Sequence, residues 1–482
     1  MTIRALAMPW AAPGERTYCL PTSVLVTLAL GEAPEAVPSL IDVRRAHAAP
    51  ATALDGGAID RIVKRYAGDA RVARVHAAAA SWNRPGRRHR HFDALEQTSG
   101  VARTFVLSVA AGTPVGALAQ ALAQIPTVVS ASPNYVTVSP LGAVAELEAD
   151  PASDDAWAPR LMIRGPEALA YEPGDSATLI GLVDSGVALE HPEMAGRLRA
   201  GFDTVHLGND GVAPGIKLLG EHRGYDTNPT DHFVGHGMAC AGIIGGVGVR
   251  MPPGQAGDSQ IIPMRALAAA KLPNRATPVG LGAIADLDAA VKLAVDLGAK
   301  VINLSFGTED SALAPSSPKP HAETVRYALA RGVILVAASG NNGRETDYWP
   351  AKHDGVIAVG ACDAHGEPTT FSTRGSHVAL CAPGERVLSA GLEGYQLVTG
   401  TSFAAPFVAA AAGLLASRAS RRAVPLTGET ARRLLTESAQ PFANGTVSGC
   451  GTGVLDAAAA LIALDAMIDQ ERSEESSEEN DE

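Results

Sequence analysis

The sequence predicts an α/β fold with a mostly parallel sheet and helices on both faces, preceded by a small N-terminal α+β domain. From about residue 174, short and nearly continuous apolar runs alternate with helical patterns. Such runs, rich in Val and Ile, are typical of parallel strands buried on both faces. The four clearest runs are ATLIGLVD, KVINLSFG, GVILVAASGN and GVIAVGA. Helical patterns over 284–297 and 323–330 lie between them, and Gly332 closes the second.

The region before residue 150 has a different order of elements. Its apolar patterns predict strands and helices in the order β-α-β-β-α-β, which is that of a ferredoxin-like domain. The expected strands span 23–31, 70–79, 103–112 and 127–139, and the expected helices span 58–68 and 114–125.

Composition and periodicity divide the chain into five segments. They are an N-terminal extension (1–19), the α+β domain (20–141), an acidic linker (142–157), the large α/β domain (158–466) and an acidic tail (467–482). The linker has no hydrophobic period, and the tail is a run of like charges that cannot bury apolar surface. We therefore expect a flexible linker and a disordered tail.

Charge and hydropathy argue against several kinds of partner. A formal net charge of −12 disfavours nonspecific nucleic-acid binding, because an acidic surface repels phosphates. We expect the basic loop at 84–91 to be a solvent-exposed loop that binds no nucleic acid. No run is expected to span a membrane, and Pro9, Trp10 and Pro13 interrupt the first apolar stretch. We expect no nucleic-acid or membrane partner and a cytoplasmic location, with secretion as the alternative.

The cysteines indicate neither a disulfide framework nor a zinc ribbon. They are odd in number, widely spaced and without a CxxC pair. We expect them to be small buried hydrophobic residues. They are Cys19, Cys240, Cys362, Cys381 and Cys450.

Polar residues at the ends of the predicted parallel strands are the first candidates for a functional site. In open α/β sheets, ligands bind outside the carboxyl ends of the strands. Asp184, Ser305 and Asn341 each follow an apolar run of this kind. The sequence therefore predicts a site at this edge of the sheet.

Three further stretches combine into one chemical unit. Asp184 lies in GLVDSGVALEHPEM, His236 in DHFVGHGMACAGIIGG and Ser402 in GTSFAAP. Taken singly, each has a structural explanation as a turn former, a buried histidine or a helix cap. Taken together, a carboxylate can orient a histidine that removes the proton of a serine, in one of the known chain orders. Asn341, in AASGNNG, offers an amide to a developing oxyanion.

The stretches DSGV, GHGMACAG, VINLSFG, AASGNNG and GTSFAAP resemble the motifs of subtilisin-like serine proteases, in the family's order across about residues 160–460. The resemblance implies that Asp184 is the orienting acid and His236 the general base and acid. It implies that Ser402 is the nucleophile and Asn341 the oxyanion donor.

The same resemblance implies an endopeptidase that binds an extended polypeptide against backbone groups. The implied substrate-binding residues are Ser305, Phe306, Gly307, Ala338, Ser339 and Gly340. The sequence departs from the family at Met238, where Thr or Ser is common, and in the charged turn after Asn341.

The N-terminal domain resembles a subtilase propeptide, because IPTVVSASPNYVTVSP is similar to that domain's last strand. The resemblance implies that the domain acts as an intramolecular inhibitor whose end lies along the substrate cleft. We expect self-cleavage between about Ser139 and Trp157. The alternative is a permanent partner-binding module in a chain that works uncut.

Two other functions remain open at this point. His232 and His236 are spaced i, i+4, and with Asp184 they could form a zinc site, although Gly235 and Gly237 weaken a helix there. A noncatalytic peptide-binding module with a subtilase fold is the second. We expect no metal and no cofactor; calcium is possible but not indicated, because no loop has a recognisable ligand spacing.

Overall fold

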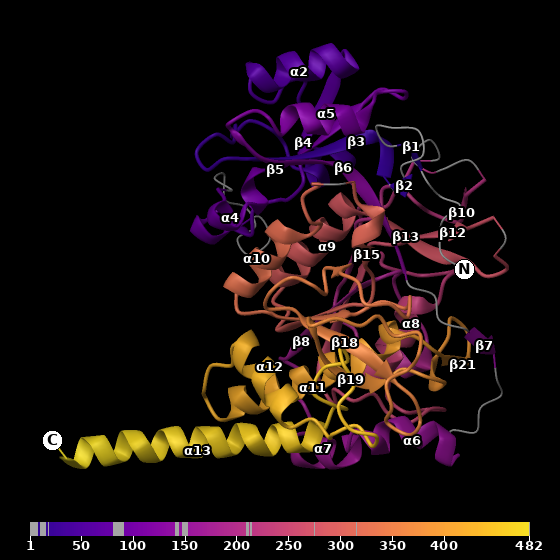
Figure 1. Cartoon of the computed structure of the whole chain (residues 1–482), viewed down its shortest axis with the longest axis vertical. Coiled ribbons are helices and arrows are strands. Elements are labelled where there is room, and N and C mark those ends of the chain that lie inside the picture. Colours follow the sequence, from indigo (N-terminus) through magenta and orange to yellow (C-terminus); the bar gives the residue numbers. More distant parts are fainter. Residues whose placement is uncertain are drawn as a thin grey trace.

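The computed structural model shows a large α/β domain and a smaller N-terminal domain packed on one side of it (Figure 1). The described residues are 8–9, 16–17, 19–80, 91–139, 144–146, 153–208, 212, 215–273, 275–314 and 316–481. The basic loop at 84–90 and most of the expected N-terminal extension lie outside them.

A seven-stranded parallel sheet forms the centre of the large domain, as the sequence predicts. Its strand order is β19-β18-β16-β14-β8-β11-β9, and every neighbouring pair is parallel. The strands are β8 (Leu179–Asp184), β9 (Phe202–Asp203), β11 (Gln260–Arg265), β14 (Val301–Leu304), β16 (Ile334–Ala338), β18 (Ile357–Cys362) and β19 (Val378–Pro383).

Helices cover both faces of this sheet, which is why its strands are apolar throughout. Leu182 packs into the core beneath α8 and α11, whereas its neighbour Val183 packs into the core beneath α9 and α10. The helices are α6 (Asp154–Met162), α7 (Gly165–Tyr171), α8 (His236–Gly245), α9 (Ile284–Asp296), α10 (Ala322–Ala330), α11 (Thr401–Arg421), α12 (Gly428–Glu437) and α13 (Ala457–Asp481).

The N-terminal domain has the predicted ferredoxin-like topology. Its strands are β3 (Cys19–Leu28), β4 (Ala70–Arg74), β5 (Thr104–Val109) and β6 (Val128–Val138), and its helices include α1 (Leu40–Arg44), α2 (Ala58–Ala67), α4 (Ala94–Ser99) and α5 (Val115–Leu122). The four strands are antiparallel in the order β6-β3-β5-β4. The βαββαβ order therefore closes into one sheet.

This sheet continues into the large domain. Three strands of the large domain extend it beyond β6, namely β13 (Val279–Ala283), β12 (Ala268–Lys271) and β10 (Lys217–Leu218). The hydrophobic core beneath α9 also contains residues of both domains, among them Phe105 and Leu287. The two domains thus share a sheet and a core.

The acidic linker differs from the expectation of a flexible segment. Helix α6 begins at Asp154, inside the expected linker, and Ala156 is buried in the core. The oxygen of Ser153 accepts the N–H of Ala156, and two aspartates stand in the first turn, both of which favour a helix start. Farther upstream, β7 (Val144–Glu146) pairs with β21 (Tyr395–Val398).

The acidic tail also differs from the expectation of disorder. Helix α13 runs unbroken to Asp481 and projects away from the body of the protein in Figure 1. Its first half is anchored by buried residues, including Leu461, Leu464 and Ile468. Glutamate is a good helix former, so a helix that is already nucleated by packing propagates through the charged residues.

Helix α11 is long and apolar enough to cross a membrane by length and composition, contrary to the expectation that no run would be. Within the described residues, 89% of its apolar window is buried inside the protein. It is the central core helix that packs on the parallel sheet. All five cysteines are free and buried, as predicted.

The approach of α11 to the sheet gives a test of this packing. A Cβ atom at Gly413 would lie 2.7 Å from Cδ1 of Ile180 on β8. We expect Gly413→Leu to lower the free energy of unfolding by about 1–3 kcal/mol, because overpacking displaces the helix. The control is Gly428→Ala, where a Cβ would meet only the Val333 oxygen at 4.0 Å. Urea denaturation should leave the control within about 0.5 kcal/mol of the parent; equal effects would contradict the packing argument.

Candidate active site

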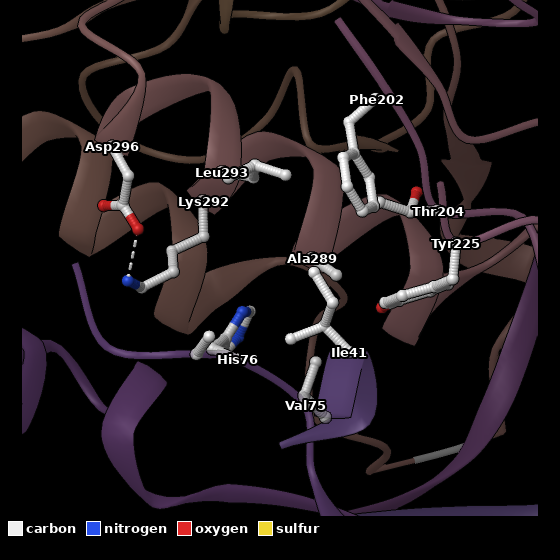
Figure 2. A pocket seen from close by; sticks show the side chains of 11 residues that line it. Ile41, Val75, His76, Phe202, Thr204, Tyr225, Ala289, Lys292, Leu293 and Asp296 are labelled. Atoms are coloured by element: carbon white, nitrogen blue, oxygen red, sulfur yellow. Dashed lines mark hydrogen bonds and ion pairs between the residues drawn. The ribbon is translucent and has the colours of Figure 1, made fainter. Parts of the chain in front are cut away.

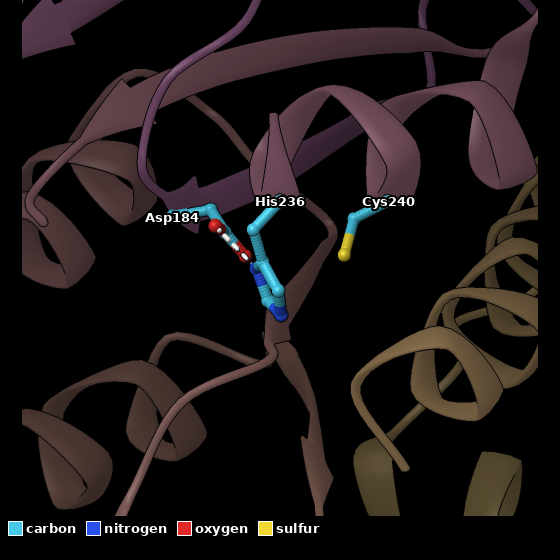
Figure 3. A group of neighbouring side chains, drawn as sticks. All are labelled: Asp184, His236 and Cys240. Atoms are coloured by element: carbon cyan, nitrogen blue, oxygen red, sulfur yellow. Dashed lines mark hydrogen bonds and ion pairs between the residues drawn. The ribbon is translucent and has the colours of Figure 1, made fainter. Parts of the chain in front are cut away.

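Asp184 and His236 meet at the carboxyl edge of the parallel sheet. Asp184 is the last residue of β8, and His236 is the first residue of α8. The Nδ1 atom of His236 lies 2.7 Å from Oδ1 of Asp184, and both side chains are buried (Figure 3). A Cβ at Gly237 would lie 2.3 Å from the Gly186 oxygen. Only glycine therefore lets the start of α8 come this close to β8.

A second carboxylate, which the sequence analysis missed, holds the loop before His236. Asp231 accepts the backbone N–H groups of Phe233, Val234 and Gly235 at 2.8–2.9 Å. It also accepts the Ser185 hydroxyl at 2.7 Å. The only sequence signal was an aspartate in a polar loop, a residue type that often organises its own turn.

Ser402 lies beside this pair, inside the first turn of α11. Gly400 occupies the N-cap position, so the helix-cap explanation of Ser402 does not hold. The Ser402 carbonyl accepts the Ser305 hydroxyl at 2.7 Å and the Cys240 thiol at 3.4 Å. The residue after Ser402 is Phe403, and the centroid of its ring lies 5.2 Å from the centroid of the His236 ring. The three stretches singled out in the sequence thus converge.

Asn341 follows β16 and faces the start of α11. Its Oδ1 accepts both the N–H and the hydroxyl of Thr401, each at 2.9 Å. Two donors on one side require the amide oxygen there. The Nδ2 group is therefore turned away from Thr401, and it is buried without a hydrogen-bond partner in the described part of the chain.

The expected substrate-binding residues lie at the ends of two neighbouring strands. Ser305, Phe306 and Gly307 follow β14, and Ala338, Ser339 and Gly340 end or follow β16. The Phe306 side chain is fully buried against the ring of His321, so only its backbone is available to a peptide. A Cβ at Gly307 would lie 2.3 Å from the Tyr348 ring.

The end of the N-terminal domain lies along these residues. Val138, the last residue of β6, forms an antiparallel bridge with Gly307. The Ser139 N–H donates to the Gly280 oxygen at 3.0 Å, and the Gly280 N–H donates to the Ser139 hydroxyl at 3.1 Å. The described chain resumes at β7, on the strand β21 that leads into α11.

Three side chains of the site are of the types that bind metal ions. Atoms of Asp184, His236 and Cys240 lie within 4.8 Å of one another (Figure 3). Metal-bound cysteine must lose its proton, but burial, with Asp184 nearby, raises the pKa of the Cys240 thiol well above its ordinary value. Nδ1 of His236 and Oδ1 of Asp184 are already hydrogen-bonded to each other. The donor set therefore does not fit a metal ion well.

The shared helical face that the zinc hypothesis assumed for His232 and His236 is not formed. His232 is exposed and precedes α8, which begins only at His236. The left-handed conformation of Gly235, with φ of 73°, separates the two residues. They do not share a helical face.

Several characterised proteases are similar to the large domain. A thermophilic serine proteinase from Bacillus sp. (strain AK1) is 34% identical over 249 residues, which is 51% of this chain and 53% of that protein. Thermitase from Thermoactinomyces vulgaris is 33% identical over 259 residues, which is 53% of this chain and 80% of that protein. The chain thus spans about half the length of the first relative and most of the second.

A solved structure supports the fold. A protease from Pseudoalteromonas arctica PAMC 21717 superposes with a TM-score of 0.53 at 23% identity, covering 65% of this chain and 98% of the other. At this identity the likeness concerns the fold alone.

The comparisons correct the expected cytoplasmic location. One relative is a halolysin-like extracellular serine protease, Nep, from Natrialba magadii, 30% identical over 280 residues. The aligned region covers 56% of this chain and 46% of that protein. Relatives of this kind point away from the cytoplasm, and the expectation failed because it rested on the composition of a few N-terminal residues.

The model of the subtilase family matches residues 175–453, which is more than half of the chain and includes Asp184, His236, Asn341 and Ser402. The matched part contains the parallel sheet and helices α8 to α12. The chain therefore belongs to the subtilase family, and it is a subtilisin-like serine endopeptidase.

Proposed function

We propose that the chain hydrolyses peptide bonds with Ser402 as nucleophile, His236 as general base and acid, and Asp184 as the orienting acid. The observation that carries the proposal is the 2.7 Å contact between His236 Nδ1 and Asp184 Oδ1, next to the helix turn that holds Ser402. The alternative, a noncatalytic peptide-binding module, would need none of these groups to be paired in this way.

The geometry supports a definite division of roles. A hydrogen on Nδ1, held by Asp184, leaves Nε2 of His236 as the basic nitrogen. Nε2 is buried and accepts no hydrogen bond from another described residue, so it is available to a hydroxyl. It would take the proton of Ser402 as the hydroxyl attacks and return it to the leaving amine. Asp184 would stabilise the imidazolium formed in between.

The oxyanion would lie between two donors. We propose the Nδ2 group of Asn341 as one and the backbone N–H of Ser402 as the other. The bonds from Thr401 to the Asn341 oxygen support this orientation of the amide. The amino end of α11 adds positive potential at the same place.

Active-site labelling tests the proposed nucleophile and base. A fluorophosphonate probe reacts with an activated serine, so we expect labelling of the processed wild type but not of Ser402→Ala or His236→Ala. The matched control is His232→Ala, at an exposed histidine outside α8, which should label like the wild type. Equal labelling of all four proteins would exclude Ser402 as the nucleophile.

The oxyanion role of Asn341 is tested by its kinetics. We expect Asn341→Ala to lower kcat by about 10²–10³, a magnitude taken over from subtilisin itself, with little change in KM. The amide acts only when charge develops on the substrate oxygen, so it stabilises the transition state more than the bound substrate. Asn444→Ala, at an exposed amide, is the control. A rise in KM without loss of kcat would remove Asn341 from this role.

We propose further that the N-terminal domain is an intramolecular inhibitor. The antiparallel contact of Val138 with Gly307, one of the expected substrate-binding residues, and the pairing of β6 with β13 support this role. Such strand addition uses backbone hydrogen bonds and needs no particular side chains.

Charged side chains strengthen the docking of the N-terminal domain on α9. Arg44 of α1 pairs with Asp286 at 2.7 Å, and Glu96 of α4 pairs with Lys292 at 2.6 Å. The Asn134 side chain accepts the N–H of Ala285 at the start of α9. A domain held by buried pairs of this kind would stay bound after the chain is cut.

Self-processing is expected within the interval from about Ser139 to Trp157, outside the paired strand β7 and upstream of helix α6. Intact-mass measurement after purification should give two fragments from the wild type and one full-length species from Ser402→Ala. The two fragments should co-elute in gel filtration, because the sheet and core are shared. A full-length and fully active wild type would instead support the permanent, uncut module.

A further inference from the structure

His76 lies at the contact between the N-terminal domain and α9, outside the proposed active site. It follows β4 and is only 2% exposed. Neither ring nitrogen has a hydrogen-bond partner among the described residues. A small cavity of about 20 Å³ lies beside the ring. Figure 2 shows the ring at this cavity, facing Lys292 and Asp296 of α9, with Ile41 and Val75 on its own side.

The carboxylates near His76 are already engaged. Lys292 Nζ binds Glu96 Oε1 and Asp296 Oδ2, each at 2.6 Å. The other oxygen of Asp296 accepts the hydroxyl of Tyr327 at 2.6 Å. Neither carboxylate is hydrogen-bonded to His76, and both are paired with Lys292, whose positive charge offsets their attraction for an imidazolium.

The remaining polar groups around His76 are cations or neutral. Arg74, two residues away on β4, donates to the carbonyl oxygens of Ala102 and Pro34. Tyr225, across the cavity, stays neutral because burial raises its pKa. Burial first, then Lys292 and Arg74, hold the pKa of His76 well below its ordinary value of 6.5. The docked state therefore accommodates only the neutral imidazole.

We propose that His76 is an acid-sensitive latch: its protonation releases the N-terminal domain from α9. That this release would activate the enzyme rests on the proposed inhibitory role of the domain; the latch itself concerns docking alone. In the released state the ring reaches water and can take up a proton, whereas in the docked state it would put a third positive charge beside Lys292 and Arg74 in a buried place.

The sign of the effect follows from the direction of the shift. Docking lowers the pKa of His76, so the released ring takes up a proton at a pH where the docked ring stays neutral. Above about pH 6.5 both rings are neutral and docking is unaffected; below it, docking weakens as the pH falls. For a released pKa near 6.5, His76 weakens docking by up to about tenfold per pH unit. Between pH 7.5 and pH 5.0 the loss is about 30-fold.

Other groups at the same interface also titrate in acid and must be separated from His76. Burial raises the pKa of Asp286 and of Asp296, so acid would weaken their pairs with Arg44 and Lys292. Burial and then Arg44 lower the pKa of His206 to about 3, so it too favours release in acid. These contributions remain when His76 alone is replaced.

The experiment measures docking in the full-length Ser402→Ala chain, which does not depend on catalysis. Hydrogen-exchange protection factors, corrected for the intrinsic rate, are determined for amides of β13 and α9 at pH 7.5 and pH 5.0. We expect the protection to fall about 30-fold more in this parent than in the same chain carrying His76→Phe or His76→Gln, neither of which can be protonated in this range.

Matched controls are His47→Phe and His47→Gln, at an exposed histidine of the same domain. They should keep the full pH dependence of the parent. Because a buried substitution can perturb folding, NMR titration of the His76 ring in the parent gives an independent measure, with no protonation expected while the domain is docked. The proposal is overturned if the His76 variants retain the parent's pH dependence or if the ring titrates near 6.5 with the domain still docked.

Discussion

The need to bury both faces of a parallel sheet governs this structure. One face is covered by α8 and α11, whose first turns bring His236 and Ser402 to the carboxyl edge where Asp184 ends β8. The other face is covered by α9 and α10, and its core extends into the N-terminal domain. The proposed active site is therefore built by helices on one face of the sheet, whereas the N-terminal domain docks on a helix of the other face and reaches the substrate-binding residues through its last strand.

Helix α9 links the sheet to the N-terminal domain. It approaches β8 at Ala294, whose Cβ would lie 3.2 Å from a Cβ at Gly181, and it presents Asp286 and Lys292 to the N-terminal domain. The strand β13 immediately before it pairs with β6, so one short segment of chain supports both the docking surface and the substrate strand. A charge change at this surface is thus placed to alter access to the active site without touching its residues.

Much of the fold and the site could be predicted because local patterns and motif residues carry them. The four apolar runs became β8, β14, β16 and β18, and the βαββαβ order became the ferredoxin-like sheet. The errors lie where context overrides composition: α6 starts inside the expected linker, and α13 continues through the acidic tail. In both cases packing of a neighbouring segment stabilises a helix that charge and periodicity alone did not reveal.

The sequence by itself determined the residue types of the site and their chain order, because the chemistry restricts them to Asp, His, Ser and Asn in recognisable surroundings. Only the tertiary structure decided that Asp231 holds the loop of His236, that the amide of Asn341 is turned by Thr401, and that His76 is buried beside Lys292. The contacts of Asn341 and His76 join residues far apart in the chain, and even the local bonds of Asp231 depend on backbone geometry that composition does not reveal.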